Sequence, residues 1–379
     1  MSRLTFIAIL TICLSKWSYA QHRDSLIFGG QASVWINYNP DKKLSLHSGV
    51  RYIPQVNYAI NNGNRKLDFE LSLNLNAGAG IRPFDSIKGN ADVKPYRAWM
   101  RYSGKQFDLR LGLQKINFGS AQMLRPLMWF DQVDPRDPLQ MTDGVWGLLG
   151  RYYFLNNANI WLWALYPSDK PKTWEFTRTH KNIPEAGGRI QIPAARGEVA
   201  FSYHWRVTDT RDNQLDLPQI SKVHENRFGI DGKWDPGAGI WFEATHTSHN
   251  KSLNALTHQS MLTTGADYTF RIGNGLTMVV ENIIAASGRK AFSYDRPLDF
   301  TGASLSYPLS IFCNISAIIY YDWKNGAAYN FLNYKRSIRA FDFFLMVYTN
   351  PETYLMPAQA SENNYFAGKG IQIMMVYNH

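Results

Sequence analysis

The stretch LDFELSLNLNAGAGI, residues 67–81, alternates strictly between apolar residues and polar or glycine residues. Successive side chains of a β-strand point to opposite faces, so this pattern separates the two kinds of residue. On a helix the same apolar residues would be scattered around the whole circumference. The stretch is also longer than the roughly 5–6 residues typical of strands in soluble proteins. It predicts a long strand with one apolar and one polar face.

The same period of two recurs along the chain, for example at residues 107–113, 198–206 and 371–377. Short turn-like links alternate with longer polar connections, a wiring that is typical of outer-membrane barrels. The short links are expected at 61–63, 103–104, 156–157, 194–195, 236–237, 273–275 and 308–309. The longer connections are expected at 85–91, 122–144, 167–186, 207–223, 250–258, 288–298 and 350–365.

We therefore predict an all-β fold, a transmembrane antiparallel up-and-down β-barrel of about 18 strands. The hairpin at residues 40–43 and the segment 324–339 allow a different count, with 16 strands as the fallback. A closed barrel pairs every backbone group internally, which lipid requires. Residues on lipid-facing registers near strand ends, such as Tyr96, Tyr102 and Tyr152, are expected to belong to aromatic belts at the membrane interfaces.

The composition agrees with a membrane barrel. Of the 379 residues 14% are aromatic and 18% are charged, which excludes a disordered chain. No apolar run is long enough for a transmembrane helix. The net charge is +10, but the basic residues are spread along the strands, so nucleic acid is not an expected partner.

Residues 1–20 are expected to be a signal peptide, with Arg3 before an apolar stretch and a small-residue cleavage site at 18–20. Residues 21–379 then form a single barrel domain in the outer membrane of a Gram-negative bacterium. Only Cys313 remains after cleavage, so no internal disulfide can form.

The alternation places a series of arginines on the inner face of the barrel. They could form a basic series that lowers the barrier for anions, or a structural network of salt bridges with interleaved acids. The sequence leaves both interpretations open. The expected pore-lining arginines are Arg97, Arg101, Arg110, Arg151, Arg189, Arg206 and Arg227.

The connection at residues 122–144 is unusually apolar for an external loop, so we expect it to fold into the barrel and narrow the pore. Arg125, Asp131, Asp134, Arg136 and Asp137 would then lie at the constriction. The spacing of the three aspartates also suggests Ca²⁺ ligands. Because arginines compete for these carboxylates, we expect salt bridges and no metal or other cofactor.

The run from Arg110 to Gln114, followed by Asn117-Phe118-Gly119, resembles porin-type outer-membrane barrels. More broadly, the chain is similar to alginate-export-like substrate-selective channels. The resemblance implies passive diffusion of small hydrophilic solutes, anionic or carbohydrate-like, through a barrel in contact with outer-membrane lipid. A monomer is the favoured state. The final residues, Asn378 and His379, depart from the aromatic end that is common in such barrels.

The alternative function is a closed barrel that serves as a binding or scaffold subunit of an outer-membrane secretion or assembly complex. An enzyme is not expected, because the sequence contains no nucleophile elbow and no HExxH motif.

Overall fold

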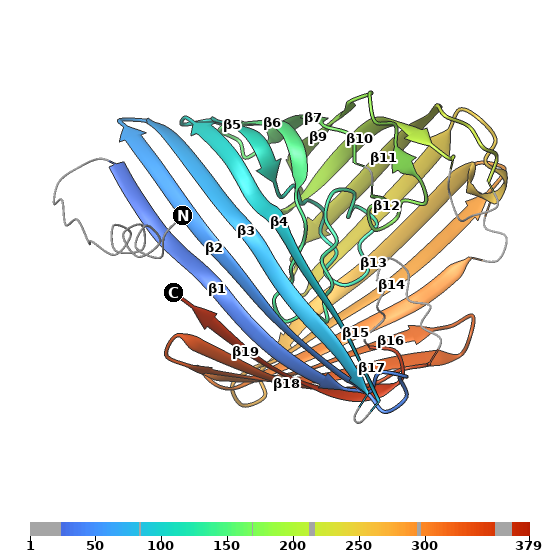
Figure 1. Cartoon of the computed structure of the whole chain (residues 1–379). Coiled ribbons are helices and arrows are strands. Elements are labelled where there is room, and N and C mark those ends of the chain that lie inside the picture. The colour runs from blue at the N-terminus through green and yellow to red at the C-terminus, as the bar shows by residue number, and fades with distance from the viewer. Residues whose placement is uncertain (1–23, 83–84, 169, 212–216, 294–296, 353–365) are drawn as a thin grey trace, which may run out of the picture.

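The computed structural model describes residues 24–82, 85–168, 170–211, 217–293, 297–352 and 366–379. The strands form one sheet that closes on itself, because β1 pairs with both β2 and β19 (Figure 1). β8 is a two-residue strand within the connection from β7 to β9, and these two longer strands pair directly. The wall is therefore a closed antiparallel barrel of 18 strands, which confirms the predicted fold.

Each wall strand is antiparallel to its neighbours, and most are longer than strands of soluble proteins. The strands are β1 (Asp24–Tyr38), β2 (Leu46–Asn62), β3 (Arg65–Arg82), β4 (Ser86–Ser103), β5 (Phe107–Gln114), β6 (Val145–Tyr153), β7 (Asn159–Leu165), β8 (Arg178–Thr179), β9 (Glu185–Ala194), β10 (Gly197–Asp209), β11 (Val223–Trp234), β12 (Gly239–His249), β13 (His258–Phe270), β14 (Leu276–Gly288), β15 (Leu298–Ser310), β16 (Cys313–Asp322), β17 (Ala327–Ile338), β18 (Phe341–Thr349) and β19 (Lys369–Asn378). A single 3-10 turn, η1 (Asn254–Leu256), is described between β12 and β13.

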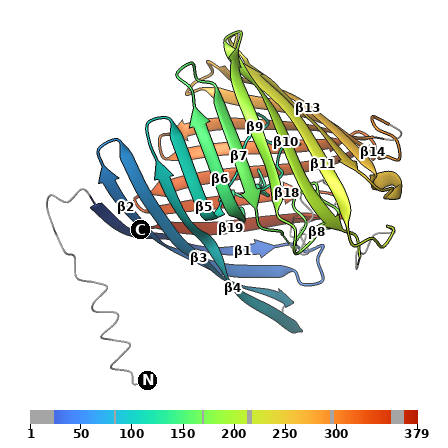
Figure 2. The same cartoon turned by 90° about the horizontal axis from the view of Figure 1, so that it is seen from above.

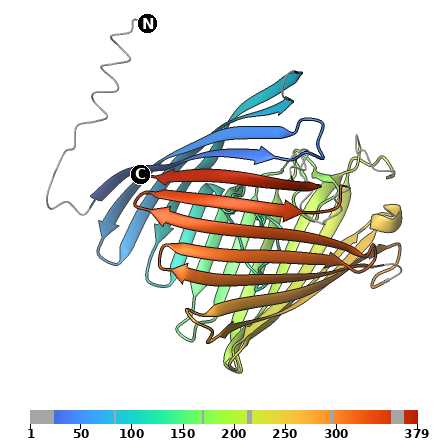
Figure 3. The same ribbon diagram turned by 90° about the horizontal axis from the view of Figure 1, so that it is seen from below.

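Tight turns connect the strands at one end of the barrel, and longer connections join them at the other end, as expected. Residues 63–64 and 195–196 are turns, whereas residues 115–144 and 166–184 are long connections. Asp24 pairs with Ile60, close to a tight turn, so β1 starts at the turn end. β19 ends there as well, and the two strands lie side by side in views from above and below (Figures 2 and 3). The predicted signal peptide lies outside the described residues.

Two predicted connections are wrong. Pro308 and Leu309 belong to β15, and the turn follows at residues 311–312. A register shift near Pro308 accommodates this residue, which has no N–H to donate to the sheet. Residues 86–91 begin β4 and are not part of a loop, because the alternation of outward Ile87 and Val93 extends the strand. The uncertain segment 324–339 contains β17, so the count is 18 and not 16.

The outer wall is apolar. On β3, Leu71 and Leu73 point outward and are 61% and 45% exposed, whereas Asp68 and Ser72, at alternating positions of the same strand, point inward and are buried. The Tyr102 ring lies beside the Phe107 ring on this outer face, tilted by 53° with ring centres 5.5 Å apart. Among the described residues, no helix is long and apolar enough to cross a membrane.

Tyr96 is not on the outer face, contrary to the prediction. Ser72 pairs with Arg97 and Leu73 pairs with Pro95, so Tyr96 is an extra residue in β4. Such a bulge turns a side chain away from the regular alternation. The Tyr96 hydroxyl lies 3.7 Å from the Met141 sulfur of the long connection inside the barrel.

Candidate pore constriction

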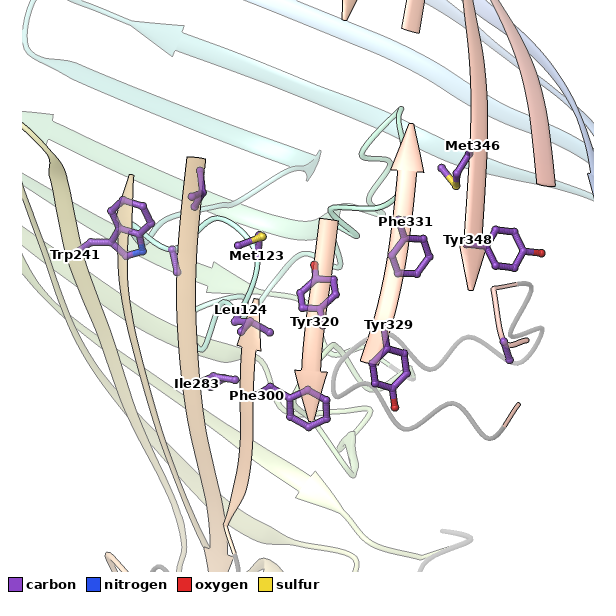
Figure 4. Packing of buried hydrophobic residues seen from close by; sticks show 13 residues of the cluster. Met123, Leu124, Trp241, Ile283, Phe300, Tyr320, Tyr329, Phe331, Met346 and Tyr348 are labelled. Carbon is purple, nitrogen blue, oxygen red and sulfur yellow. The ribbon is translucent and has the colours of Figure 1, made fainter. Parts of the chain in front are cut away.

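The connection between β5 and β6, residues 115–144, folds into the barrel lumen, as the sequence predicted (Figure 1). We refer to residues 115–144 as the constriction loop. Met123 and Leu124 of this loop pack against Ile283, Phe300 and other buried side chains of the wall (Figure 4). The inner face of β14–β18 is therefore partly apolar and aromatic, which the expectation of a polar inner face did not include.

A second cluster fixes the first and middle parts of the constriction loop. The Phe118 ring stacks on the Trp163 ring of β7, with ring centres 5.7 Å apart. Phe130 contacts the same tryptophan edge-on at 5.4 Å. Trp129, which is 3% exposed, belongs to the same cluster. Aromatic pairs of this kind add stabilising free energy beyond that of their buried area. The loop is therefore packed like a protein core.

Glu281 of β14 holds one end of the loop through main-chain hydrogen bonds. Its carboxylate accepts hydrogen bonds from the backbone N–H groups of Gln122, Met123 and Leu124 at 2.6, 2.8 and 2.6 Å. The Trp241 indole N–H donates to the same carboxylate at 3.0 Å. Successive N–H groups form a concavity that binds an anion, and here the anion is supplied by the barrel wall.

Glu243 of β12 is a second carboxylate of the same kind. It accepts hydrogen bonds from the backbone N–H groups of Ala121 and Leu127 at 2.7 and 3.1 Å. Gly119 has φ +99°, and a side chain there would collide with the Glu243 carboxylate. The sequence prediction assigned no role to either glutamate, because their partners are backbone groups of a distant segment.

We expect Glu281→Gln to loosen the constriction loop. The introduced glutamine amide has one acceptor oxygen. Its NH₂ group would face the remaining backbone N–H donors of the loop, so charge-assisted hydrogen bonds worth about 1.5–3 kcal/mol each are lost or weakened. The variant should show noisier single-channel current and a lower melting temperature in detergent. Asp267→Asn is the matched control, because among the described residues the Asp267 carboxylate hydrogen-bonds the Gln122 side chain, at 3.3 Å, and no backbone N–H of the loop. Equal behaviour of the two variants would refute the anchoring role.

The three aspartates of the loop have separate partners. Asp134 pairs with Arg136 at 2.6 Å, and Asp131 lies 3.6 Å from Arg125. Asp137 accepts hydrogen bonds from the backbone N–H groups of Leu139 and Met141 at 3.0 and 3.2 Å. Burial raises the pKa of the Asp137 carboxyl, and these backbone bonds oppose the rise. In the described part of the chain no cluster of three candidate metal ligands is found.

Arg136 reaches across the lumen to β17. Its guanidinium carbon lies 5.3 Å from the centre of the Phe331 ring and 5.2 Å from the centre of the Phe366 ring. Such cation–π contacts add attraction to the ion pair with Asp134. Arg125 donates a hydrogen bond to the Phe118 carbonyl oxygen at 3.1 Å and also contacts Asn117. Both predicted constriction arginines therefore brace the loop.

The return segment of the loop is attached to β4. Arg97 is 8% exposed and donates a hydrogen bond to the Thr142 carbonyl oxygen at 3.1 Å. Lys94 pairs with Asp143 at 2.8 Å. Arg97, expected to line the pore, is thus a buried contact between wall and loop.

On β9–β11 the predicted pore arginines are buried in ion pairs. Arg189 contacts both oxygens of Asp231 at 2.6 and 2.8 Å. Arg206 and Arg227 both pair with Glu225, at 2.7 and 2.6 Å, and both also contact Glu175 of the connection 166–184. The geometry in this sector is that of the salt-bridge network, one of the two interpretations left open by the sequence.

On β4–β6 the arginines are arranged differently. Arg101 pairs with Asp68 at 2.9 Å. Arg110 lies over the Trp99 ring at 4.7 Å, and Arg151 lies over the Trp161 ring at 3.8 Å. Among the described residues neither Arg110 nor Arg151 forms an ion pair with a carboxylate. In this sector aromatic rings take the place of carboxylates beside these two arginines.

Two polar cavities flank the return segment, and both are lined by Asp137. One, of about 280 Å³, lies beside β2–β4 and is lined by Arg51, Lys94 and Gln132 among others. The other, of about 250 Å³, lies beside β16–β18 and includes Lys335. Solutes could occupy these two volumes inside the barrel, next to the loop.

Arg51 was missing from the sequence prediction. Val50 and Tyr52 are exposed on the outer wall, so the intervening Arg51 faces inward. Within the described part of the chain its Nε has no hydrogen-bond partner, and the guanidinium lies 5.4 Å from the Trp35 ring centre. The local alternation of Val50-Arg51-Tyr52 could have identified it.

The fold and the inward loop define a class, the porin-type outer-membrane β-barrel. Two solved structures are similar over nearly the whole chain. OccAB4 from Acinetobacter baumannii has a TM-score of 0.56 at 8% identity, covering 95% of this chain and 98% of that one. OmpT, an outer membrane protein from Vibrio cholerae solved in trimer form, has a TM-score of 0.52 at 12% identity, covering 94% and 100%. No protein-family model and no curated protein sequence matches the chain.

Proposed function

We propose that the protein is an outer-membrane channel for passive diffusion of small hydrophilic solutes, with a preference for anionic or carbohydrate-like ones. The observation that carries the proposal is the pair of polar cavities beside Asp137, with Arg51 and Lys94 at one of them. Volumes of about 280 and 250 Å³ lie near or below the lower limit of roughly 300 Å³ for small-molecule sites, which favours small solutes.

The preference for anions rests on Arg51, Arg110 and Arg151. A guanidinium keeps its charge at any physiological pH and can bind a carboxylate or phosphate through two parallel hydrogen bonds. Aromatic rings hold these groups in place, as Trp161 does for Arg151 at 3.8 Å. Arg189, Arg206 and Arg227 contribute little to selectivity in this proposal, because carboxylates neutralise them.

We expect the wild-type channel to prefer chloride over potassium in a KCl gradient, and Arg51→Glu combined with Arg110→Glu to reverse that preference. Each substitution replaces a positive charge on the inner wall, one that forms no ion pair among the described residues, with a negative one. Reversal potentials in planar bilayers measure the change. Lys105→Glu combined with Lys324→Glu, in two exposed turns, is the control with the same change in charge. Unchanged selectivity in the double variant would contradict the role of these arginines.

The second candidate is a closed barrel acting as a binding or scaffold subunit of an outer-membrane secretion or assembly complex. It is favoured by the two apolar clusters with which the constriction loop fills part of the lumen. Conductance separates the candidates, because only the channel carries ions. We propose no enzymatic activity and no cofactor, and we favour a monomer.

A further inference from the structure

A groove of about 840 Å³ runs along the outside of the barrel over β7 and β9–β13. Its sides are outward-facing apolar residues, including Leu162, Phe201 and Phe228, which are 64%, 56% and 52% exposed. Smaller residues on the same outward rows, Gly188 and Ala244, form its floor. The groove is therefore an apolar channel on the membrane-facing wall and does not belong to the lumen.

The end of the groove near the long connections is covered by aromatic and imidazole rings. Phe292, from the connection between β14 and β15, lies over His246 with ring centres 4.4 Å apart. His246 stacks near His258 at 5.6 Å and contacts the Ser260 hydroxyl at 2.9 Å. Beneath these rings Ser260 is only 4% exposed, although it belongs to an outward row. The groove thus changes from apolar to polar toward the loop end of the barrel.

The connections next to this polar end are basic. Arg289 and Lys290 are exposed and directly precede Ala291 and Phe292. Lys251 is exposed in the neighbouring connection, and residues 250–257 contain no acidic residue. Positive side chains at a membrane surface attract anionic lipid headgroups. The apolar groove therefore matches the acyl chain of a lipid, and the basic residues at the loop end match its anionic headgroup.

We propose that this groove binds a lipid with a phosphate-bearing headgroup, its acyl chain along Leu162, Phe201 and Phe228 and its phosphate beside Arg289 and Lys290. The inference rests on the membrane location in the proposed function, but it does not depend on transport. A second copy of the chain fits less well, because the outer wall of a barrel is convex and would leave a concave groove unfilled.

A second groove on the outer wall offers an internal comparison. It has a volume of about 470 Å³ over β19 and β1–β4 and is lined by Val34, Val50 and Ala77 among others. Among the described residues that line it, none is a histidine and none comes from a long connection. It can hold an acyl chain but lacks the polar cover, so it should not select for the headgroup.

The test uses the full-length protein in phosphatidylcholine bilayers with spin-labelled phosphatidylglycerol or spin-labelled phosphatidylcholine. Electron paramagnetic resonance gives the association constant of each lipid from its motionally restricted fraction. We expect wild type to prefer phosphatidylglycerol, and Arg289→Gln with Lys290→Gln to reduce that preference by about fivefold for each basic residue. Ala244→Trp, which fills the groove, should lower the association constant of phosphatidylglycerol to that of phosphatidylcholine.

Ala77→Trp in the second groove is the matched control and should leave the preference unchanged. Far-UV circular dichroism and the resistance of the barrel to SDS show that each variant is folded, which keeps the result separate from the transport proposal. Equal association of both lipids with wild type would overturn the inference. So would an unchanged preference in Ala244→Trp, or a dimer or trimer that protects the groove from both lipids.

Discussion

Replacing residues 122–143 with a short Gly-Ser linker is expected to raise the single-channel conductance several-fold. These residues supply most of the loop side chains in both apolar clusters and most of the backbone groups bound by Glu243 and Glu281. Their removal widens the lumen of the 18-strand wall, and barrels of this size leave an aqueous channel when the lumen is not filled. Conductance steps in planar bilayers measure the effect.

The control inserts the same linker between Pro236 and Gly237, in an exposed turn at the other end of the barrel. It should leave the conductance unchanged. If neither the wild-type barrel nor the variant lacking residues 122–143 conducts ions, transport is ruled out and the scaffold function remains.

Glu225→Ala is expected to lower the free energy of unfolding by about 3–5 kcal/mol, the usual cost of leaving a buried charge without its partner. Glu225 is 2% exposed and pairs with Arg206 and Arg227. His249 contacts the same carboxylate at 3.0 Å. The alanine variant would leave two buried guanidinium groups with Glu175 as their shared remaining carboxylate.

The measurement is denaturant unfolding in lipid vesicles, followed by tryptophan fluorescence. Glu198→Ala is the matched control, because Glu198 is an exposed glutamate on the neighbouring strand β10. It should change stability by no more than about 0.5 kcal/mol. A similarly small effect of Glu225→Ala would show that the ion network does not stabilise the barrel.

The architecture could be predicted because a barrel wall repeats one simple pattern. Side chains alternate between lipid and lumen, so stretches such as residues 67–81 reveal the faces without knowledge of their partners. The inward course of residues 122–144 was also predictable, because a solvent-exposed loop has no reason to carry so many apolar residues. The errors at Tyr96 and Pro308 occurred where a bulge or register shift interrupts the alternation.

The roles of individual residues were harder to predict, since they depend on contacts between distant segments. Arg97, Arg110 and Arg206 are equivalent in the sequence pattern, yet Arg97 binds the constriction loop, Arg206 is in a buried ion network and Arg110 is braced by Trp99. Glu281 and its three backbone donors are separated by almost 160 positions in the chain. No local pattern contains that information.

The most direct test of the central claim is the ionic current through the purified full-length protein in a planar bilayer under a KCl gradient. The proposed channel predicts discrete conductance steps for wild type, smaller than those of the variant lacking residues 122–143, with a reversal potential that favours chloride. Correctly folded protein that inserts into the bilayer and gives no conductance steps, with or without the loop, would contradict it.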